Sequence, residues 1–372
     1  MKNFNSGTII NQGYYNAFIP NIINREWVLD NIDVQYLLSH ADRLLGKMDM
    51  YSQYVDIDLF LKMHIVKEAT QSSKIEGTQT NYEEAFMKKE DIVIERRDDW
   101  EELQNYISAM NFAVNELKTL PFSTRLIKQT HKILLQGVRG KQKLPGEFRR
   151  SQNWIGGVTI NEARFIPPPH TEVQELISDL EKFANNENNR LPDLLKIALI
   201  HYQFETIHPF LDGNGRIGRL LITLFLVSKG ILKYPILYLS DFFERHRDLY
   251  YDNLTIVRRE NDINQWLKFF LVGVMEISNK GIETFDGILK LQKSINERIA
   301  KLGVRAEDAR NLINCLYKKP IINAIEAQII CNKSLASIYK LLSDLEKMGI
   351  LHEITGGQRG RNYIFKEYIE LF

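Results

Sequence analysis

At 372 residues, the chain exceeds the usual size of a single domain, so its length predicts two or three domains. Hydrophobic residues make up 44% and charged residues 26% of the chain, which is typical of a globular protein and argues against intrinsic disorder. Because 48 basic side chains face 47 acidic ones, the net charge is only +1, and this excludes binding to nucleic acid or membrane through an overall field.

The opening residues, MKNFNSGTII, lack a basic stretch followed by a long apolar run, and no window reaches the length of a membrane span. The two cysteines, Cys315 and Cys331, have no metal-ligand side chains around them, which favours idle thiols in a reducing compartment. We therefore expect a cytoplasmic protein with no membrane partner.

Residues 1–30 are rich in Asn, Tyr and Ile and are expected to form an extended arm. From residue 31 to about 280, apolar residues recur at intervals of three and four, which predicts a series of amphipathic helices and a mainly α fold. The exception is residues 151–169, SQNWIGGVTINEARFIPPP, where β-branched and aromatic residues surround Gly-Gly and three prolines follow. This stretch predicts a small β-hairpin.

After residue 280 the pattern changes. Residues 281–300 predict a connector helix, and residues 301–372 predict three helices and a hairpin that turns at GGQRG, which resembles a winged helix-turn-helix. Such modules bind DNA, bind proteins or form homodimers, and all three remain open. The side chains expected to contact DNA phosphates are Lys333, Ser337 and Lys340 on the recognition helix and Arg359 and Arg361 on the wing.

The stretch HPFLDGNGRIGRLL, residues 208–221, places dense polar chemistry directly before a buried helix. Gly213 and Gly215 flank Asn214 at the helix start, where glycines allow several backbone N–H groups to point at one spot and the helix dipole favours an anion. Arg216 and Arg219 lie three residues apart, so both can offer planar forks to phosphate oxygens.

Two further side chains complete this pattern. Asp212 suits Mg2+, which takes one or two carboxylates and fills its shell with phosphate oxygens and water. His208 can accept a proton at neutral pH, because its unperturbed pKa lies near 6.5. A base, a metal ligand and a phosphate cradle predict phosphoryl or nucleotidyl transfer.

Residues 208–219 match the signature of the Fic family: His-Pro-Phe, any residue, Asp or Glu, Gly-Asn-Gly-Arg, any two residues, Arg. The resemblance covers most of residues 35–280. It implies an all-helical Fic core at 106–280 with the hairpin as a flap, preceded by an N-terminal helical region at 1–105. It also implies transfer of AMP from ATP to a Ser, Thr or Tyr hydroxyl of a target protein.

By this resemblance His208 deprotonates the target, Asp212 holds magnesium, Asn214 and the glycine N–H groups hold the α-phosphate, and Arg216 and Arg219 hold the β- and γ-phosphates. Relatives that phosphorylate instead have a lysine where this chain has Gly215. The full set of expected ATP-binding residues is Asp212, Gly213, Asn214, Gly215, Arg216, Gly218, Arg219, Ile155, Gly156, Gly157, Tyr250 and Tyr251. The target backbone is expected to pair with the flap edge, at residues 153–157.

A second stretch, SSKIEG, resembles the inhibitory pattern of the same family in Ser72, Glu76 and Gly77. Ser72 and Glu76 are four apart and share one helical face. The resemblance implies that Glu76 pairs with Arg219 and takes the place of the ATP γ-phosphate. The same acid could instead position water to remove AMP from a modified target.

One functional alternative stays open at this point. The Fic portion of a DNA-binding regulator could merely sense nucleotide, although a sensor has no need of His208. The histidines His131 and His201, on apolar helices, are expected to be packed structural residues, since neither has a metal-ligand partner one turn away.

Overall fold

The computed structural model describes residues 1–79, 81–137, 141–357 and 360–372. The chain starts with two antiparallel strands, β1 (Gly7–Asn11) and β2 (Asn16–Pro20), so the expected extended arm is a hairpin. The hairpin is held by the protein behind it, since Phe18 is buried and its N–H donates to the carbonyl of Ile166 at 3.0 Å. Pattern alone did not reveal this, because β1 is largely exposed.

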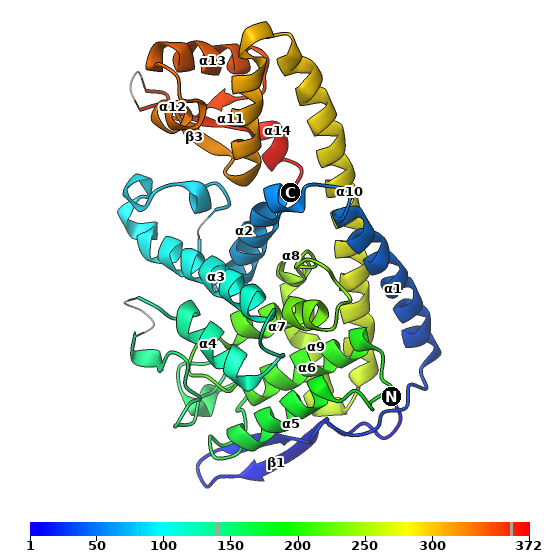
Figure 1. The fold of residues 1–372 in the computed structure, drawn as a ribbon. Coiled ribbons are helices and arrows are strands. Elements are labelled where there is room, and N and C mark those ends of the chain that lie inside the picture. Colours follow the sequence, from blue (N-terminus) through cyan, green and yellow to red (C-terminus); the bar gives the residue numbers. More distant parts are fainter. Residues whose placement is uncertain (80, 138–140, 358–359) are drawn as a thin grey trace.

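The predicted mainly α fold is confirmed by the helices that follow (Figure 1). They are α1 (Ile32–Ser52), α2 (Ile57–Ile75), α3 (Arg97–Glu116), α4 (Thr124–Leu134), α5 (Val173–Asn185), α6 (Asp193–Ile207), α7 (Asn214–Ser228), α8 (Ser240–Arg245), α9 (Arg247–Glu260) and α10 (Ile263–Ala300). Short 3-10 turns lie at Glu84–Phe86, Lys89–Asp91, Ile94–Arg96, Lys141–Lys143, Ile160–Glu162 and Gly303–Arg305.

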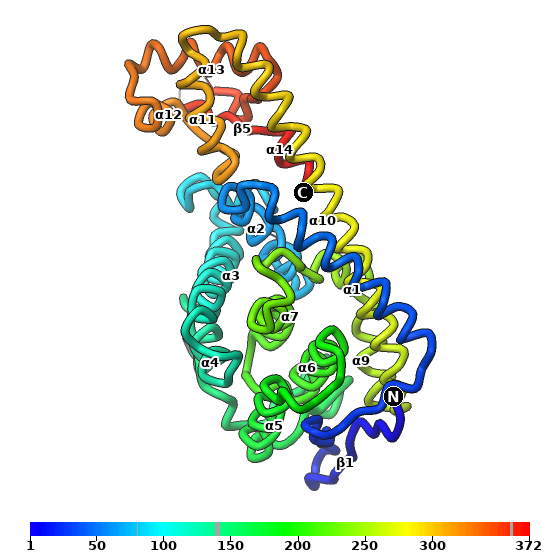
Figure 2. The backbone as a smooth tube through the Cα atoms, turned by 45° about the vertical axis from the view of Figure 1, so that its right-hand side comes forward, coloured from blue at the N-terminus to red at the C-terminus, as the bar shows by residue number. Residues whose placement is uncertain are grey.

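Helices α6 and α7 form the centre of the fold, and both are buried along nearly their whole length. They pack on one another and contact α2, α3, α4, α5 and α10, which surround them (Figures 1 and 2). Burial on all sides explains why their sequences are apolar all round rather than amphipathic. The loop between them, residues 208–213, is therefore fixed at both ends by the core.

Helix α10 is one continuous helix of 38 residues that runs along α1 and on toward the C-terminal elements (Figure 2). The expected connector at 281–300 is its second half, so no break separates connector and core. Among the helices that the structure describes, none is both long and apolar enough to pass through a bilayer.

The C-terminal elements are α11 (Ala306–Lys318), β3 (Ile321–Asn323), α12 (Ala324–Cys331), α13 (Leu335–Lys347), β4 (His352–Glu353), β5 (Asn362–Ile364) and α14 (Lys366–Ile369). The three expected helices and the hairpin are present. Strand β3, which the sequence analysis missed because it is only three residues long, joins them in a sheet of order β3-β5-β4. Arg359 lies outside the described residues. Cys315 and Cys331 form no disulfide.

Candidate active site

The loop between α6 and α7 is shaped by two residues in the left-handed region. His208 ends α6 at φ 49° and ψ 60°, and Gly213 precedes α7 at φ 75°. A histidine pays for this conformation with strain, whereas glycine adopts it freely. Gly213 also lies so close to α4 that a Cβ atom would sit 3.3 Å from Leu134 Cδ2. The two left-handed residues bring the end of α6 next to the start of α7.

Asn214 locks this loop. Its side chain is buried, accepts a hydrogen bond from the N–H of Phe210 at 2.8 Å and donates to the carbonyl of the same residue at 2.9 Å. These two bonds fix the shape of the loop and leave the second N–H of the amide outside them. That Asn214 also holds the α-phosphate, as the resemblance implies, stays a prediction.

The first turn of α7 supplies the anion cradle. The first N–H groups of a helix have no acceptor within the helix. In α7 the first intrahelical hydrogen bond runs from the N–H of Ile217 to the carbonyl of Gly213 at 3.0 Å. The N–H groups of residues 214–216 thus converge at the helix start, where the dipole is positive. This is the arrangement expected from the glycines.

The imidazole of His208 is half-buried beside the cradle, and within the described ranges no hydrogen-bond partner reaches its buried Nδ1. Burial lowers the pKa of His208 to about 4, and the positive charges of Arg149 and Arg258 act in the same direction, whereas Glu76 opposes them. The ring is therefore neutral at pH 7. A neutral imidazole can accept a proton, as a general base must.

Arg149 and Asn153 hold the backbone of His208 from the flap side, and neither role was predicted. Arg149 Nε donates to the His208 carbonyl at 3.0 Å and Nη1 donates to the carbonyl of Ser151 at 3.2 Å. Asn153 Nδ2 donates to the carbonyls of Phe210 at 2.9 Å and His208 at 3.3 Å. The only sequence signal was an arginine next to the flap, in EFRRSQNW.

His131 and His201 are buried supports of the loop, as predicted. His131 Nδ1 accepts from the N–H of Gly146 at 2.9 Å, so its Nε2 carries the proton and donates to the carbonyl of Asp212 at 3.0 Å. His201 bonds the carbonyl of Gly218 through Nδ1 at 2.8 Å. Both rings fix the backbone of the signature.

Asp212 and Arg216 border a cavity of about 400 Å³ between α3, α4 and the loop. Arg216 is buried and donates to Glu102 of α3 at 3.2 Å and to Asp212 Oδ1 at 3.4 Å. Its Nε has no partner among the residues that the structure describes. The guanidinium charge lies at the cavity, where Glu102 and Asp212 already use two of its N–H groups. Glu102 was not predicted, because nothing in the sequence pairs α3 with the signature.

The carboxylate of Asp212 is the side chain expected to hold a metal ion. Its side chain is 45% exposed, and its Oδ1 accepts from the N–H of Gly213 at 2.5 Å. In the described part of the chain, no group of three or more His, Cys, Asp or Glu side chains could hold a metal ion. A single half-exposed carboxylate fits Mg2+, which binds through phosphates and water, and does not fit an ion that needs a complete protein cage.

The inhibitory stretch meets the last arginine of the signature. Arg219 is buried and donates to Ser72 Oγ at 2.9 Å, to the Ser72 carbonyl at 2.9 Å and to Glu76 Oε1 at 2.6 Å. Burial raises the pKa of Glu76, but the charge of Arg219 outweighs burial and holds that pKa below its usual value. Gly77, at φ 99°, ends α2 directly after Glu76. Ser72 and Glu76 therefore lie together against α7, and Gly77 follows them at the end of α2.

The carboxylate of Glu76 fills the space above Gly215. A Cβ atom on Gly215 would collide with Glu76 Oε1 and lie 2.9 Å from Arg219 Nη1. Nearly one turn further along α7, Gly218 leaves room for the buried carboxyl of Glu205, whose Oε1 has no hydrogen-bond partner within the described ranges. Burial raises the pKa of Glu205 to about 7, and Arg219 opposes this. Glu205 was not predicted.

The expected flap is less regular than a hairpin. Residues 151–169 form one isolated antiparallel bridge, between Ile155 and Phe165, with a hydrogen bond from the N–H of Ile155 to the carbonyl of Phe165 at 2.9 Å. Gly156 and Gly157 follow at φ 73° and 74°, which interrupts an extended strand. The tip beyond the bridge is exposed. The prolines end the segment as predicted.

The two tyrosines of α9 differ in position. Tyr250 is buried, its hydroxyl lies 2.9 Å from His201 Nε2, and its ring stacks on Phe243 with centroids 4.5 Å apart. Tyr251 is 39% exposed. A nucleotide base could therefore reach Tyr251, whereas Tyr250 belongs to the aromatic core. Of the two tyrosines expected at the nucleotide, Tyr250 is thus packed in the core, and a contact of Tyr251 with the nucleotide stays a prediction.

Comparisons with known proteins agree with this geometry. The Fic/DOC family model matches residues 121–226, and the Fic/DOC family N-terminal model matches residues 36–115. The chain is 37% identical over 125 residues to the protein adenylyltransferase Fic of Culex quinquefasciatus and 36% identical to that of Aedes aegypti. Each match covers 33% of this chain and 22% of the relative, so the chain spans about a fifth of these proteins.

Solved structures share the fold at low sequence identity. A Fic family protein from Desulfovibrio desulfuricans G20 has a TM-score of 0.58 at 16% identity, covering 92% of this chain and 98% of that one. A Fic domain containing signaling protein from Bacteroides thetaiotaomicron has a TM-score of 0.53 at 20% identity, covering 68% and 97%. These likenesses concern the arrangement of the helices.

Proposed function

Because the chain belongs to the Fic/DOC family, we propose that it is a protein adenylyltransferase, which transfers AMP from ATP to a hydroxyl of a target protein. The observation that carries this proposal is the position of His208, a neutral imidazole beside the convergent N–H groups of α7. An intact base is needed for chemistry and not for nucleotide sensing, so this observation favours an enzyme over a sensor.

The reaction requires one proton acceptor. His208 takes the proton from a Ser, Thr or Tyr hydroxyl as its oxygen attacks the α-phosphorus of ATP. A bond forms between that oxygen and the α-phosphorus, the bond to the oxygen bridging to the β-phosphate breaks, and pyrophosphate leaves with the electron pair. The strained left-handed backbone of His208, held by Arg149 and Asn153, keeps the ring at the mouth of the cradle.

The triphosphate is held by the signature. The N–H groups at the start of α7 receive the α-phosphate, Arg216 contributes the charge of its guanidinium at the cavity, and Arg219 binds the γ-phosphate once Glu76 has left. Asp212 would hold Mg2+, which neutralises charge on the phosphates. The exposed ring of Tyr251 offers a face for adenine, with the residues Ile155, Gly156 and Gly157 at the border.

The ion pair of Glu76 and Arg219 suggests self-inhibition. A guanidinium fork satisfied by Ser72 and Glu76 cannot bind a γ-phosphate at the same time. ATP then binds without its terminal phosphate in place, and transfer is slow. Release of Arg219 therefore requires either a movement of α2 or a rotation of the Glu76 side chain.

Removal of AMP is a second candidate activity for the same site. The side chain of Glu76 is 36% exposed although it pairs with a buried arginine, so solvent reaches its carboxylate. A carboxylate in that position can orient a water molecule toward the α-phosphorus. Incubation of an AMP-modified target with the protein distinguishes the two directions, since only removal releases AMP.

The target is proposed to dock on the flap. The backbone of residues 153–157 lies at the entrance to His208, and the tip at Val158 is 88% exposed. An extended target segment can pair with such an edge through main-chain hydrogen bonds, which makes few demands on sequence. Substitution of Val158 by proline leaves the core untouched and is expected to reduce modification of the target more than self-modification.

The C-terminal elements are proposed to form a winged helix-turn-helix, for which DNA is one partner. Lys333, Ser337 and Lys340 are exposed near or on α13, and Arg361 is exposed on the wing. Lys333 also lies 3.7 Å from Asp308, a weak ion pair that phosphate could replace. Titration of random duplex at several salt concentrations tests this, because phosphate contacts make affinity fall steeply with salt.

The decisive experiment for the main proposal is incubation with labelled ATP and magnesium, followed by mass spectrometry of the protein and of cell extract proteins. The proposal expects a mass increase of one AMP on a hydroxyl side chain. Transfer of the γ-phosphate, or no covalent product from the Glu76→Gly form, would contradict it.

A further inference from the structure

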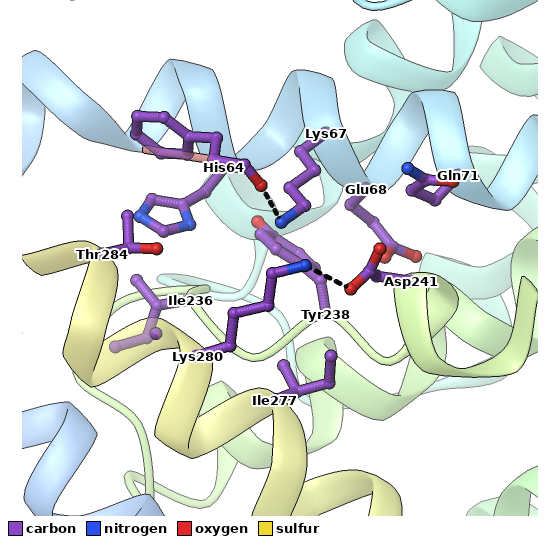
Figure 3. A pocket seen from close by; sticks show the side chains of 12 residues that line it. His64, Lys67, Glu68, Gln71, Ile236, Tyr238, Asp241, Ile277, Lys280 and Thr284 are labelled. Carbon is purple, nitrogen blue, oxygen red and sulfur yellow. Dashed lines mark hydrogen bonds and ion pairs between the residues drawn. The ribbon is translucent and has the colours of Figure 1, made fainter. Parts of the chain in front are cut away.

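A separate cavity of about 440 Å³, including its open mouth, lies about one to three turns before Glu76 along α2. Its walls are α2, the start of α8 with the loop before it, α10 and Phe372 (Figure 3). None of the signature residues lines it. The cavity is therefore distinct from the candidate active site, but it shares the helix that carries the inhibitory glutamate.

Two lysines point toward one another across this cavity, Lys67 from α2 and Lys280 from α10 (Figure 3). Lys280 Nζ pairs with Asp241 Oδ2 at 2.9 Å, and Lys67 Nζ donates to the main-chain oxygen of Phe372. Burial lowers the pKa of Lys67 to about 8, and the nearby charge of Lys280 acts in the same direction. An ammonium has three N–H donors, so each lysine keeps donors beyond these contacts.

Three polar atoms around the cavity are buried and lack a partner within residues 1–79, 81–137, 141–357 and 360–372. They are His64 Nε2, Gln71 Oε1 and the hydroxyl of Tyr238. The side chains of His64 and Tyr238 belong to residues only 7% exposed. Unsatisfied buried polar groups are costly and uncommon, so three around one cavity indicate a polar occupant.

We propose that this cavity binds a small oxyanion of the phosphate class between Lys67 and Lys280. The carboxylates of Asp241 and Glu68 also line the cavity, but Lys280 holds the first, and Tyr106 and the N–H of Ser240 donate to the second. The remaining N–H donors of the two ammonium groups therefore suit a ligand made of acceptor oxygens. The donors come from opposite walls, and a tetrahedral anion presents oxygens in several directions at once, whereas a planar carboxylate presents two. The hydroxyl of Tyr238 adds a neutral donor from a third wall.

The position of this site gives it a consequence for regulation, which rests on the self-inhibition described above. An anion bridging Lys67 of α2 and Lys280 of α10 stabilises α2 where it now lies. In that position Ser72 and Glu76 hold Arg219. A ligand that binds one conformation shifts the population toward it, so the bound anion favours the inhibited state.

Binding is tested by calorimetric titration of the full chain with inorganic phosphate. We expect one site in the wild-type protein and an affinity lower by about tenfold or more in Lys280→Met and Lys67→Met. Tyr238→Phe, which removes one hydroxyl and no charge, is expected to weaken binding less. Lys290→Met is the matched control, because Lys290 is on the same helix but 77% exposed and away from the cavity.

The absence of phosphate binding by the wild type, or binding by Lys67→Met and Lys280→Met as tight as that by the wild type, would overturn the proposal and assign water to the cavity. Titration with acetate separates the phosphate class from anions in general, since acetate is expected to bind more weakly. Binding by acetate as tight as by phosphate would also contradict the proposed class.

Coupling to the active site is tested by AMP incorporation with and without phosphate. Phosphate is expected to lower incorporation by the wild type and to leave Glu76→Gly and Lys280→Met unaffected. Equal inhibition of Glu76→Gly would mean that phosphate competes with ATP and would overturn the coupling. If Glu76→Gly incorporates no AMP at all, the proposed function fails, whereas the titration still decides the anion site.

Discussion

The carboxylate of Glu76 lies 2.6 Å from the guanidinium of Arg219, although 143 residues separate the two in the chain. Burial alone would lower the pKa of Arg219, but the charge of Glu76 outweighs it and raises that pKa. Each side chain thus stabilises the charged form of the other. The pair joins the end of α2 to the second turn of α7, and we expect it to be the contact that the γ-phosphate of ATP has to replace.

Glu76→Gly is expected to raise AMP incorporation by about tenfold or more, because it removes a charge-assisted contact that competes with the γ-phosphate. Incorporation of labelled AMP into the protein itself measures this. Lys74→Ala, on the same turn and exposed, is the control and should behave as wild type. Equal incorporation by Glu76→Gly and wild type would show that the pair does not limit the reaction.

His208→Ala is expected to lower transfer by about 100-fold to 10,000-fold while ATP binding persists, since a general base contributes to the chemical step. The rate should also change little with pH between 6 and 8 through titration of His208, because its pKa is about 4 and the ring stays neutral. Rates measured in the Glu76→Gly background test both points. A steep rise of the rate near pH 6.5 would contradict the lowered pKa.

Glu102→Gln is expected to raise the KM for ATP by about threefold to tenfold with little change in kcat, because it removes a charged contact that holds Arg216 at the cavity wall. Steady-state kinetics in the Glu76→Gly background separate the two constants. A lower KM would instead make Glu102 a second inhibitory acid, competing for Arg216 as Glu76 competes for Arg219. Glu116→Gln on the same helix is the control, because Glu116 does not line the cavity.

Glu205→Gln is expected to stabilise the protein at pH 8 by about 1 to 3 kcal/mol and to leave it unchanged at pH 4.5. The folded pKa of Glu205, about 7, lies above its ordinary value of 4.5, so its favourable contribution is complete below pH 4.5 and is lost as pH rises through 7. Thermal unfolding of both forms from pH 4.5 to 8 measures this. A parallel pH dependence in the two forms would contradict it.

Local pattern was sufficient for the helices and for the signature. Residues 208–219 carry enough fixed chemistry to place a base, an anion cradle and two arginines, and Ser72 and Glu76 share a helical face that the structure brings against Arg219. The signature and the shared face of Ser72 and Glu76 are each set by neighbours within one or two turns. A single sequence can therefore display them.

Contacts between distant segments were not visible in the sequence. Three side chains act through partners that only the folded chain brings near, so no neighbouring residues in the sequence indicated their roles. They are Glu102, Glu205 and Arg149. The flap was predicted as a small hairpin from β-branched residues, and its pairing is limited to one bridge because Gly156 and Gly157 adopt positive φ directly after it. Tyr250 and Tyr251 are adjacent and alike, and burial alone separates their roles.

Helix α10 connects the two ends of the molecule as a rigid rod. Its 38 residues span about 57 Å, so a tilt of about 5° at one end displaces the other by about 5 Å. The module that it carries also contacts the inhibitory helix directly, since the ring of Phe60 on α2 lies 5.2 Å from that of Tyr317. A displacement of the C-terminal module would therefore bear directly on the helix that carries Ser72 and Glu76.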